Sequence, residues 1–269
     1  IQPTGQSVIS GQSATFSVTA TGTAPISYQW SRNGANIGGA TAATYTTSAT
    51  VTGDNGAQFT VAVSNPAGAV NSGAATLTVT AASVAPSITT QPISHTVASG
   101  QTAAFSVTAT GTAPLTYQWS KNSASVGGAT GASYTTPATT SADNGAQFSV
   151  TISNSLGSVT SNVVTLTVND PPAITSQPAA QTVLIGQTAS FAVTSSGTGP
   201  LSYQWKKNGA NISGATASSY TTPATTASDN GAQYTVVVTN SAGNITSNAV
   251  TLTVNSAPAI TSQPGNHTV

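Results

Sequence analysis

The stretch from Asp143, DNGAQFSVTISN, alternates apolar and polar residues with a period of two. Phe148, Val150 and Ile152 fall on one face, and hydroxyl-bearing residues separate them. Alternation over a short run predicts a β-strand with one buried and one solvent-facing side. The preceding Asn-Gly pair is typical of a turn. This part of the sequence therefore predicts a turn followed by a half-buried strand.

The same stretch recurs as DNGAQFTVAVSN from Asp54 and as DNGAQYTVVVTN from Asp229, so the chain is a tandem repeat. In every copy the spacings from a Gln-Pro pair to a Trp, and from that Trp to the Asp, are the same, and only the linkers differ in length. We predict domains at residues 1–80, 86–169 and 172–255, followed by the first strand of a fourth repeat at 258–269.

Other runs in each copy show the same alternation. In the second copy they are TAAFSVTAT from Thr102, LTYQW from Leu115 and VTLTV from Val164. Asn33-Gly34 and Asn208-Gly209 have the composition of two-residue hairpin turns. Short strands with a turn every 8 to 12 residues are typical of a two-sheet sandwich. The sequence therefore predicts an all-β chain of three tandem β-sandwich domains.

The composition excludes several classes of function. Only 3% of the 269 residues are charged and the formal net charge is +0, so there is no basic cluster to bind nucleic acid or a membrane surface. No apolar run approaches the roughly 20 residues of a transmembrane helix, so we expect no direct membrane insertion. Because Cys is absent, the chain has neither disulfides nor thiolate metal sites. A net charge near zero also permits self-association.

The order Phe-x-Val-x-Ala-x-Gly, Trp, Asp-Asn-Gly-Ala-Gln-[Phe/Tyr]-x-Val and an alternating last strand resembles the immunoglobulin-like repeats of large bacterial surface and secreted proteins. The resemblance covers essentially the whole chain. It implies immunoglobulin-like β-sandwiches joined in a rod, at the bacterial cell surface or outside the cell. It also implies that Phe59, Phe148 and Tyr234 occupy the tyrosine-corner position.

The resemblance places valine where this fold usually has its disulfide, because Val107 precedes Trp119 by the usual cysteine-to-tryptophan distance. We expect a contact between two valines, packed on the tryptophan, to replace the disulfide in each copy. The expected structural core residues are Val18, Trp30 and Val61 in the first copy, Val107, Trp119 and Val150 in the second, and Val193, Trp205 and Val236 in the third.

The charged residues give no sign of catalysis. Asp54, Asp143 and Asp229 recur once per copy and are expected to cap turns. Arg32, Lys121 and Lys206 are assigned to equivalent, solvent-facing hairpin positions. No copy holds the paired carboxylates, the Ser-His-Asp set or the ligand cluster that hydrolysis or metal binding needs. We therefore expect no enzymatic activity, no catalytic residues, no metal and no cofactor; the linker residue Asp170 is the one further acid.

Two kinds of function remain. The first is a structural segment of a surface stalk or fibre, whose partners are neighbouring copies of the same chain. The second is an adhesive, carbohydrate-binding or spacer module of a large secreted protein, with polysaccharide as the partner. Rows of Ser and Thr fit either, since Thr is also a good strand former. Asn211, Asn244 and Asn266 begin N-x-[Ser/Thr] sequences and are candidate glycan attachment sites.

Overall fold

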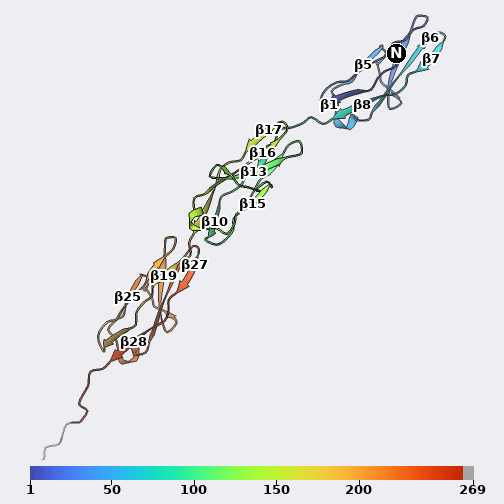
Figure 1. Ribbon diagram of the computed structural model, residues 1–269. Helices are drawn as coiled ribbons and strands as arrows, with labels where there is room; N and C mark the ends of the chain where they lie inside the picture. The colour runs from blue at the N-terminus through green and yellow to red at the C-terminus, as the bar shows by residue number, and fades with distance from the viewer. Residues whose placement is uncertain (263–269) are drawn as a thin grey trace, which may run out of the picture. The chain divides into compact units, whose positions relative to one another are not determined.

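A computed structural model describes residues 1–262 as a chain of short β-strands (Figure 1). By their internal contacts the residues fall into two compact units, Ile1–Val84 and a second that begins at Ala85. The first unit is one sandwich, here called repeat 1. The second holds two more sandwiches, repeats 2 and 3. Within residues 1–262 no helix has the length and apolarity needed to cross a bilayer.

The larger sheet of each repeat has six strands, in the order β1-β8-β6-β3-β4 in repeat 1, with β7 also paired to β6. The first strand runs parallel to β8, and the other pairs are antiparallel. In repeat 1 the strands are β1 (Gln6–Ile9), β3 (Ser27–Arg32), β4 (Ala35–Asn36), β6 (Gln58–Asn65), β7 (Gly68–Asn71) and β8 (Ala75–Thr80).

Repeats 2 and 3 build the same sheet with the same register. In repeat 2 its strands are β10 (His95–Ala98), β13 (Thr116–Lys121), β14 (Ala124–Ser125), β16 (Gln147–Asn154), β17 (Gly157–Thr160) and β18 (Val164–Asn169). In repeat 3 they are β20 (Gln181–Leu184), β23 (Ser202–Lys207), β24 (Ala210–Asn211), β26 (Gln233–Asn240), β27 (Gly243–Thr246) and β28 (Val250–Asn255).

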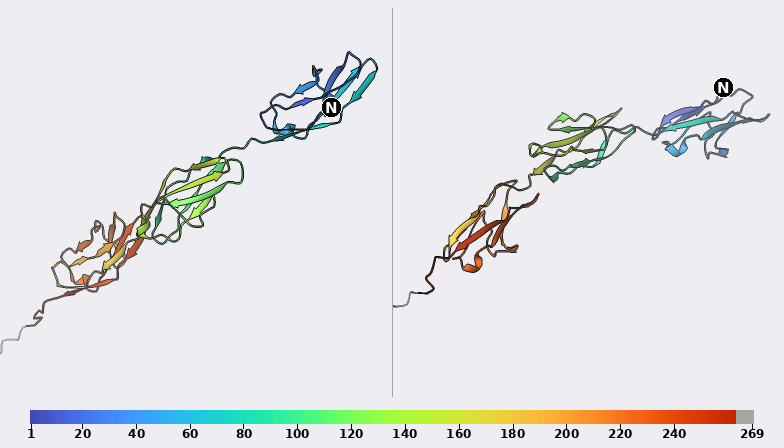
Figure 2. Two further views of the ribbon diagram at one scale, coloured as in Figure 1. Left: turned by 45° about the horizontal axis from the view of Figure 1, so that its top comes forward. Right: turned by 60° about the horizontal axis from the view of Figure 1, so that its bottom comes forward.

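The second layer of each sandwich consists of short paired strands, which Figure 2 shows from two further sides. Its two-strand pairs are β2 (Thr15–Ser17) with β5 (Thr44–Thr46), β11 (Ala104–Ser106) with β15 (Ser133–Thr135), and β21 (Ser190–Ala192) with β25 (Ser219–Thr221). Repeats 2 and 3 each add a linker strand to this layer: β9 (Ser87–Thr90) pairs with β12 (Thr108–Thr110), and β19 (Ala173–Ser176) pairs with β22 (Thr194–Ser196).

The repeated Asp-Asn-Gly stretch forms a turn and then a strand, as its pattern predicts. A single 3₁₀ turn ends at each repeated Asp: η1 (Thr52–Asp54), η2 (Ser141–Asp143) and η3 (Ala227–Asp229). The following glycine, Gly145 in repeat 2, has φ of +83°, a conformation that residues with a Cβ rarely adopt. Strand β16 then buries Phe148, Val150 and Ile152.

Aromatic side chains fill the space where a disulfide would cross the sandwich. Trp119 is fully buried, and its Nε1 donates to the carbonyl oxygen of Gly131 at 3.0 Å. Phe105, on the smaller layer, stacks on Phe148 of the larger sheet with ring centroids 4.6 Å apart. The corresponding stacks in repeats 1 and 3 have centroids 4.4 Å and 4.5 Å apart. Aromatic contacts of this kind add to the area they bury, so they join the two layers.

The valines expected at the cysteine positions lie in or against these cores. Five of the six are buried, whereas Val18 in repeat 1 is only half-buried and packs against the edge of its core. Val107 and Val193 directly precede β12 and β22, which pair with β9 and β19, whereas Val18 directly precedes Thr19, which hydrogen-bonds with Ile1, the first residue of the sequence. The buried members of the set are Val61, Val107, Val150, Val193 and Val236, together with Trp30, Trp119 and Trp205.

Candidate functional site

Each repeat contains one ion pair between the strand that carries the Trp and the 3₁₀ turn. Its cation lies two residues after the Trp, and its acid is the repeated Asp, with nitrogen and oxygen 2.5 Å apart. The assignment of Lys206 to this position was wrong, because Lys207 is the residue on the same strand face as Trp205. The cations face solvent, with 38% to 43% of each side chain exposed, and each is also engaged in one of these pairs. The three pairs are Arg32–Asp54, Lys121–Asp143 and Lys207–Asp229.

The repeated Asp also caps its turn, as its recurrence predicts. Asp143 accepts from the backbone nitrogen of Thr140 at 2.8 Å with the carboxylate oxygen that Lys121 does not contact. The Lys121 hydrogen bond, followed by that of Thr140, lowers the pKa of Asp143 to about 2. Lys207 and Thr226 lower the pKa of Asp229 to about 2 in the same way. Each carboxylate is therefore a structural group, held ionised by its own repeat.

These pairs predict a modest loss of stability in acid. In the folded chain the pKa of Asp143 and Asp229 is about 2, below the ordinary value of 3.8, so their contribution to stability is fully present above about pH 4 and is lost as the pH falls toward 2. Partly exposed pairs contribute at most about 1 kcal/mol each. We expect the urea concentration at the midpoint of unfolding to decrease as the pH is lowered from 5 to 2. Asp143→Asn should reduce this dependence, and a dependence as large as that of the unchanged chain would contradict the assignment.

The glutamine of the recurring Gln-Pro pair binds the segment between the last two strands of each repeat. The side-chain oxygen of Gln91 accepts from the backbone nitrogen of Asn162 at 2.9 Å, at the break between β17 and β18. Beside it, the buried hydroxyl of Ser161 accepts from the nitrogen of Val150. Gln2 and Gln177 make the equivalent bonds to Gly73 and Asn248. This role was missed from the sequence because the partners lie 71 residues apart.

The structure places no aromatic platform of the kind that stacks on sugars among the described residues. All three Trp are fully buried. The half-buried Tyr45, Tyr134 and Tyr220 pack against these cores, with ring centroids 6.3 Å or 6.4 Å from the Trp. These aromatic side chains therefore pack the cores of the three sandwiches.

The remaining candidates are scattered. Asn211 on β24 and Asn244 on β27 are exposed, and Asn266 lies outside the described residues. In residues 1–262 no three His, Cys, Asp or Glu side chains come together as a metal site would require. Asp170 lies in the linker between repeats 2 and 3, where its carboxylate accepts from the Ser141 hydroxyl at 2.8 Å and its carbonyl oxygen accepts from the Asn240 side chain. Asp170 therefore joins the linker to both repeats.

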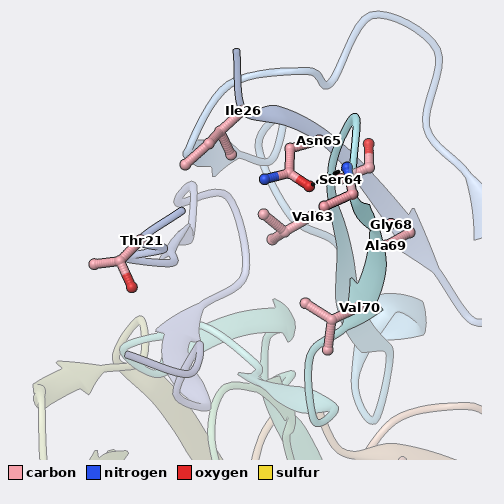
Figure 3. A pocket seen from close by; sticks show the side chains of 9 residues that line it. Thr21, Ile26, Val63, Ser64, Asn65, Gly68, Ala69 and Val70 are labelled. Carbon is pink, nitrogen blue, oxygen red and sulfur yellow. Dashed lines mark hydrogen bonds between the residues drawn. The ribbon is translucent and has the colours of Figure 1, made fainter. Parts of the chain in front are cut away.

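One hollow lies on the surface of repeat 1. It has a volume of about 300 Å³ and lies between the loop at Thr21 and strands β6 and β7. Figure 3 shows Ile26, Val63 and Val70 around this space, with Thr21 across from them. A second hollow of about 210 Å³ continues from it past Val18 toward Ile1. Together they form an elongated groove with a mixed polar and apolar lining, here called the repeat-1 groove.

Comparison with known proteins gives the same fold. Residues 171–240 match the immunoglobulin domain family. The I67–I69 I-band fragment of titin is 22% identical, with 94% of this chain and 96% of that chain covered and a TM-score of 0.52. The first four immunoglobulin domains of Sidekick-1 are 18% identical, with 94% and 74% covered and a TM-score of 0.54. The chain is thus a tandem of immunoglobulin-like domains without cysteine.

One curated relative has a similar sequence. Endoglucanase C of Cellulomonas fimi is 34% identical over 169 residues, which are 59% of this chain. The match spans only 15% of that enzyme's own length. The similarity is thus to a small part of a much longer protein.

Proposed function

We propose that this chain is a structural, non-catalytic segment of a large extracellular bacterial protein, in which immunoglobulin-like repeats form a stalk or fibre and copies associate through strand contacts. The proposal rests on one observation: the charged and the large aromatic side chains of each repeat are engaged within that repeat. Each repeated Asp is paired with a cation of its own repeat, and each Trp is buried in its own core. The surface of the repeats consists of strand edges and hydroxyl groups and has almost no charged side chains.

The low charge supports association between copies. Sheet edges are normally protected from pairing by charged residues, Lys above all. Here all but two of the charged side chains are held in the ion pairs, Lys206 and Asp170 being the exceptions. Edges without charge, on a chain of zero net charge, impose little repulsion on a second copy.

A second candidate function is supported by the similarity to Endoglucanase C. In that reading the repeats are a spacer or a carbohydrate-binding module within a large secreted enzyme. The matched region is 15% of the endoglucanase, as an accessory segment would be. The exposed Ser and Thr of the strands would then contact polysaccharide.

The two functions differ in what drives association. We would concentrate the chain in neutral buffer and follow it by light scattering and electron microscopy, and separately measure its depletion from solution by insoluble cellulose. Assembly that grows with protein concentration alone supports the structural function. A chain that remains monomeric at high concentration refutes self-assembly, and depletion by cellulose then supports the second candidate.

A further inference from the structure

The larger sheet of repeat 2 has an open edge along β17. This strand pairs with β16, and no other strand of the described residues pairs with its far side. In an antiparallel pair, successive residues direct their backbone groups alternately toward the partner strand and away from it. The backbone nitrogen of Ser161 donates to Val150 of β16, so Ser158 and Thr160 direct their backbone groups away from β16. These two residues therefore present amide and carbonyl groups that no strand of the described chain pairs.

The open edge ends where the glutamine of the Gln-Pro pair covers the strand. The backbone nitrogen of Asn162 also points away from β16, and there it donates to the side chain of Gln91 at 2.9 Å. Further along, the nitrogen of Thr165 donates to the hydroxyl of Ser94, and strand β10 then pairs with β18. The repeat thus covers its own edge after the break between β17 and β18 and leaves the edge open before it.

Repeat 3 has the same open edge along β27. The register of β27 with β26 matches that of β17 with β16, and Gln177 again binds the break that follows. Because Ser247 donates to β26, the backbone groups of Asn244 and Thr246 point away from it. Neither β17 nor β27 contains a charged residue. Both strands lie within the chain, so two repeats present the same uncharged edge.

Other edges of repeat 2 carry features that hinder the addition of a strand. Strand β9 has an irregular register and lies between Pro86 and Pro92, and bulges and prolines protect sheet edges. Strand β14 has two residues, and β15 has three and is followed closely by Pro137. On β10 the carbonyl oxygen of Ala98 already accepts from the backbone nitrogen of Gln101. Strand β17 has four residues in regular register and none of these protections.

We infer that β17 and β27 are the edges through which copies of this chain pair, each edge antiparallel to the same edge of a second copy. With the two-fold axis at Val159, Ser158 lies opposite Thr160 of the other copy, and such a pair exchanges both backbone hydrogen bonds. Val159 then faces its own counterpart at the position where side chains are closest. In β27, Ile245 takes the place of Val159. This inference rests on the proposed function, because it identifies the strand contact through which copies associate.

The edge is complementary to itself, which is why a second copy is the partner. Val159 is half-buried in its own repeat, so an identical residue across the axis would cover its exposed part. The hydroxyl groups of Ser158 and Thr160 would meet on the outer face, and Thr–Ser hydrogen bonds stabilise cross-strand pairs. One such bond, between Thr151 and Thr160 at 3.0 Å, already joins β16 to β17. Because a chain has more than one open edge, it can join more than one other copy.

The absence of Cys allows a direct test by disulfide formation. In Val159→Cys the two thiols would meet at the axis, where Cα atoms about 4.5 Å apart permit a disulfide. Pairing raises the effective concentration of the second thiol, so we expect dimers to form about tenfold faster than in Val163→Cys. Val163 is the more exposed residue, at 60%, which makes it a stringent control for random collision. Equal rates in the two variants would overturn the inference.

A mixture of two variants tests the register. Ser158→Cys and Thr160→Cys chains, mixed in equal amounts and oxidised, should form mixed dimers in excess over either homodimer, because these positions lie opposite each other across the axis. An affinity tag on one of the chains distinguishes the products on non-reducing gels. A statistical distribution of the products would overturn the inference.

Proline at the outward positions should remove the contact without removing a hydrogen bond from the repeats. We would follow Thr160→Pro, Thr246→Pro and the unchanged chain by light scattering at increasing concentration, with urea unfolding to compare their stability. Loss of association at an unchanged urea midpoint is expected. If proline lowers the midpoint, Ser158→Lys, Asn244→Lys takes its place, since charge at an edge opposes pairing without altering the backbone. Association as strong as that of the unchanged chain would refute this contact and leave self-assembly standing.

Electron microscopy of the unchanged chain separates this inference from the proposed function. Specific dimers of Val159→Cys, from a chain that forms no larger assemblies, would support the contact and refute the fibre. A chain that neither assembles nor gives specific dimers would refute both.

Discussion

Trp119→Ala is expected to destabilise repeat 2 by about 3–5 kcal/mol, the usual cost of removing a large buried aromatic side chain. Trp119 is fully buried, packs against Phe105 and Tyr134, and donates its indole hydrogen to Gly131. Without a disulfide, no covalent link limits the unfolding of this sandwich. A domain of this size has a total stability of only roughly 5–15 kcal/mol, so the loss is a large part of it.

Urea unfolding followed by far-UV circular dichroism would measure this effect, because it reports on all three repeats, whereas Trp119→Ala removes the fluorescent side chain of repeat 2. Trp119→Phe should cost less than Trp119→Ala, since it keeps an aromatic ring in the core and removes only the indole donor and some volume. Val163→Ala, at an exposed position, should change the midpoint little. A Trp119→Ala chain as stable as the Val163→Ala chain would contradict the assignment of Trp119 to the core.

Local alternation in the sequence was sufficient to predict the strands and the sandwich fold. It also contained the register of the ion pairs: residues two apart in a strand share a face, so Lys207 rather than Lys206 lies on the face of Trp205. Misassigning two adjacent lysines hid a repeated feature of the fold. The pattern itself was in the sequence.

Other features depend on contacts between distant residues. Gln91 binds the break between β17 and β18, 71 residues away, and only the paired strands bring the two together. The close contacts of Gly111 with Pro86 and of Gly197 with Pro172 also join residues that are far apart in the sequence.

Gly197→Ala is expected to destabilise repeat 3 and its linker by about 2–4 kcal/mol. Part of this cost comes from the backbone: Gly197 has φ of +135°, which is strained for a residue with a Cβ. The rest comes from overpacking, typically about 1–3 kcal/mol. The new Cβ would lie 2.9 Å from both the carbonyl oxygen of Pro171 and the Cα of Pro172. These are backbone atoms, so the linker strand itself must move.

Gly22→Ala separates the two causes, because Gly22 also has a positive φ, of +159°, but faces only side chains, the nearest atom being the Asn65 amide nitrogen at 3.3 Å. Urea unfolding of both variants should show the smaller loss for Gly22→Ala. Proteolysis should also become faster in the linker around Asp170 in the Gly197→Ala chain alone, since displacing Pro172 breaks the contact between the linker and repeat 3. Equal losses in the two variants would assign the whole effect to backbone conformation. Unequal losses would show that the close contact between Pro172 and Gly197 is the feature that orders the linker.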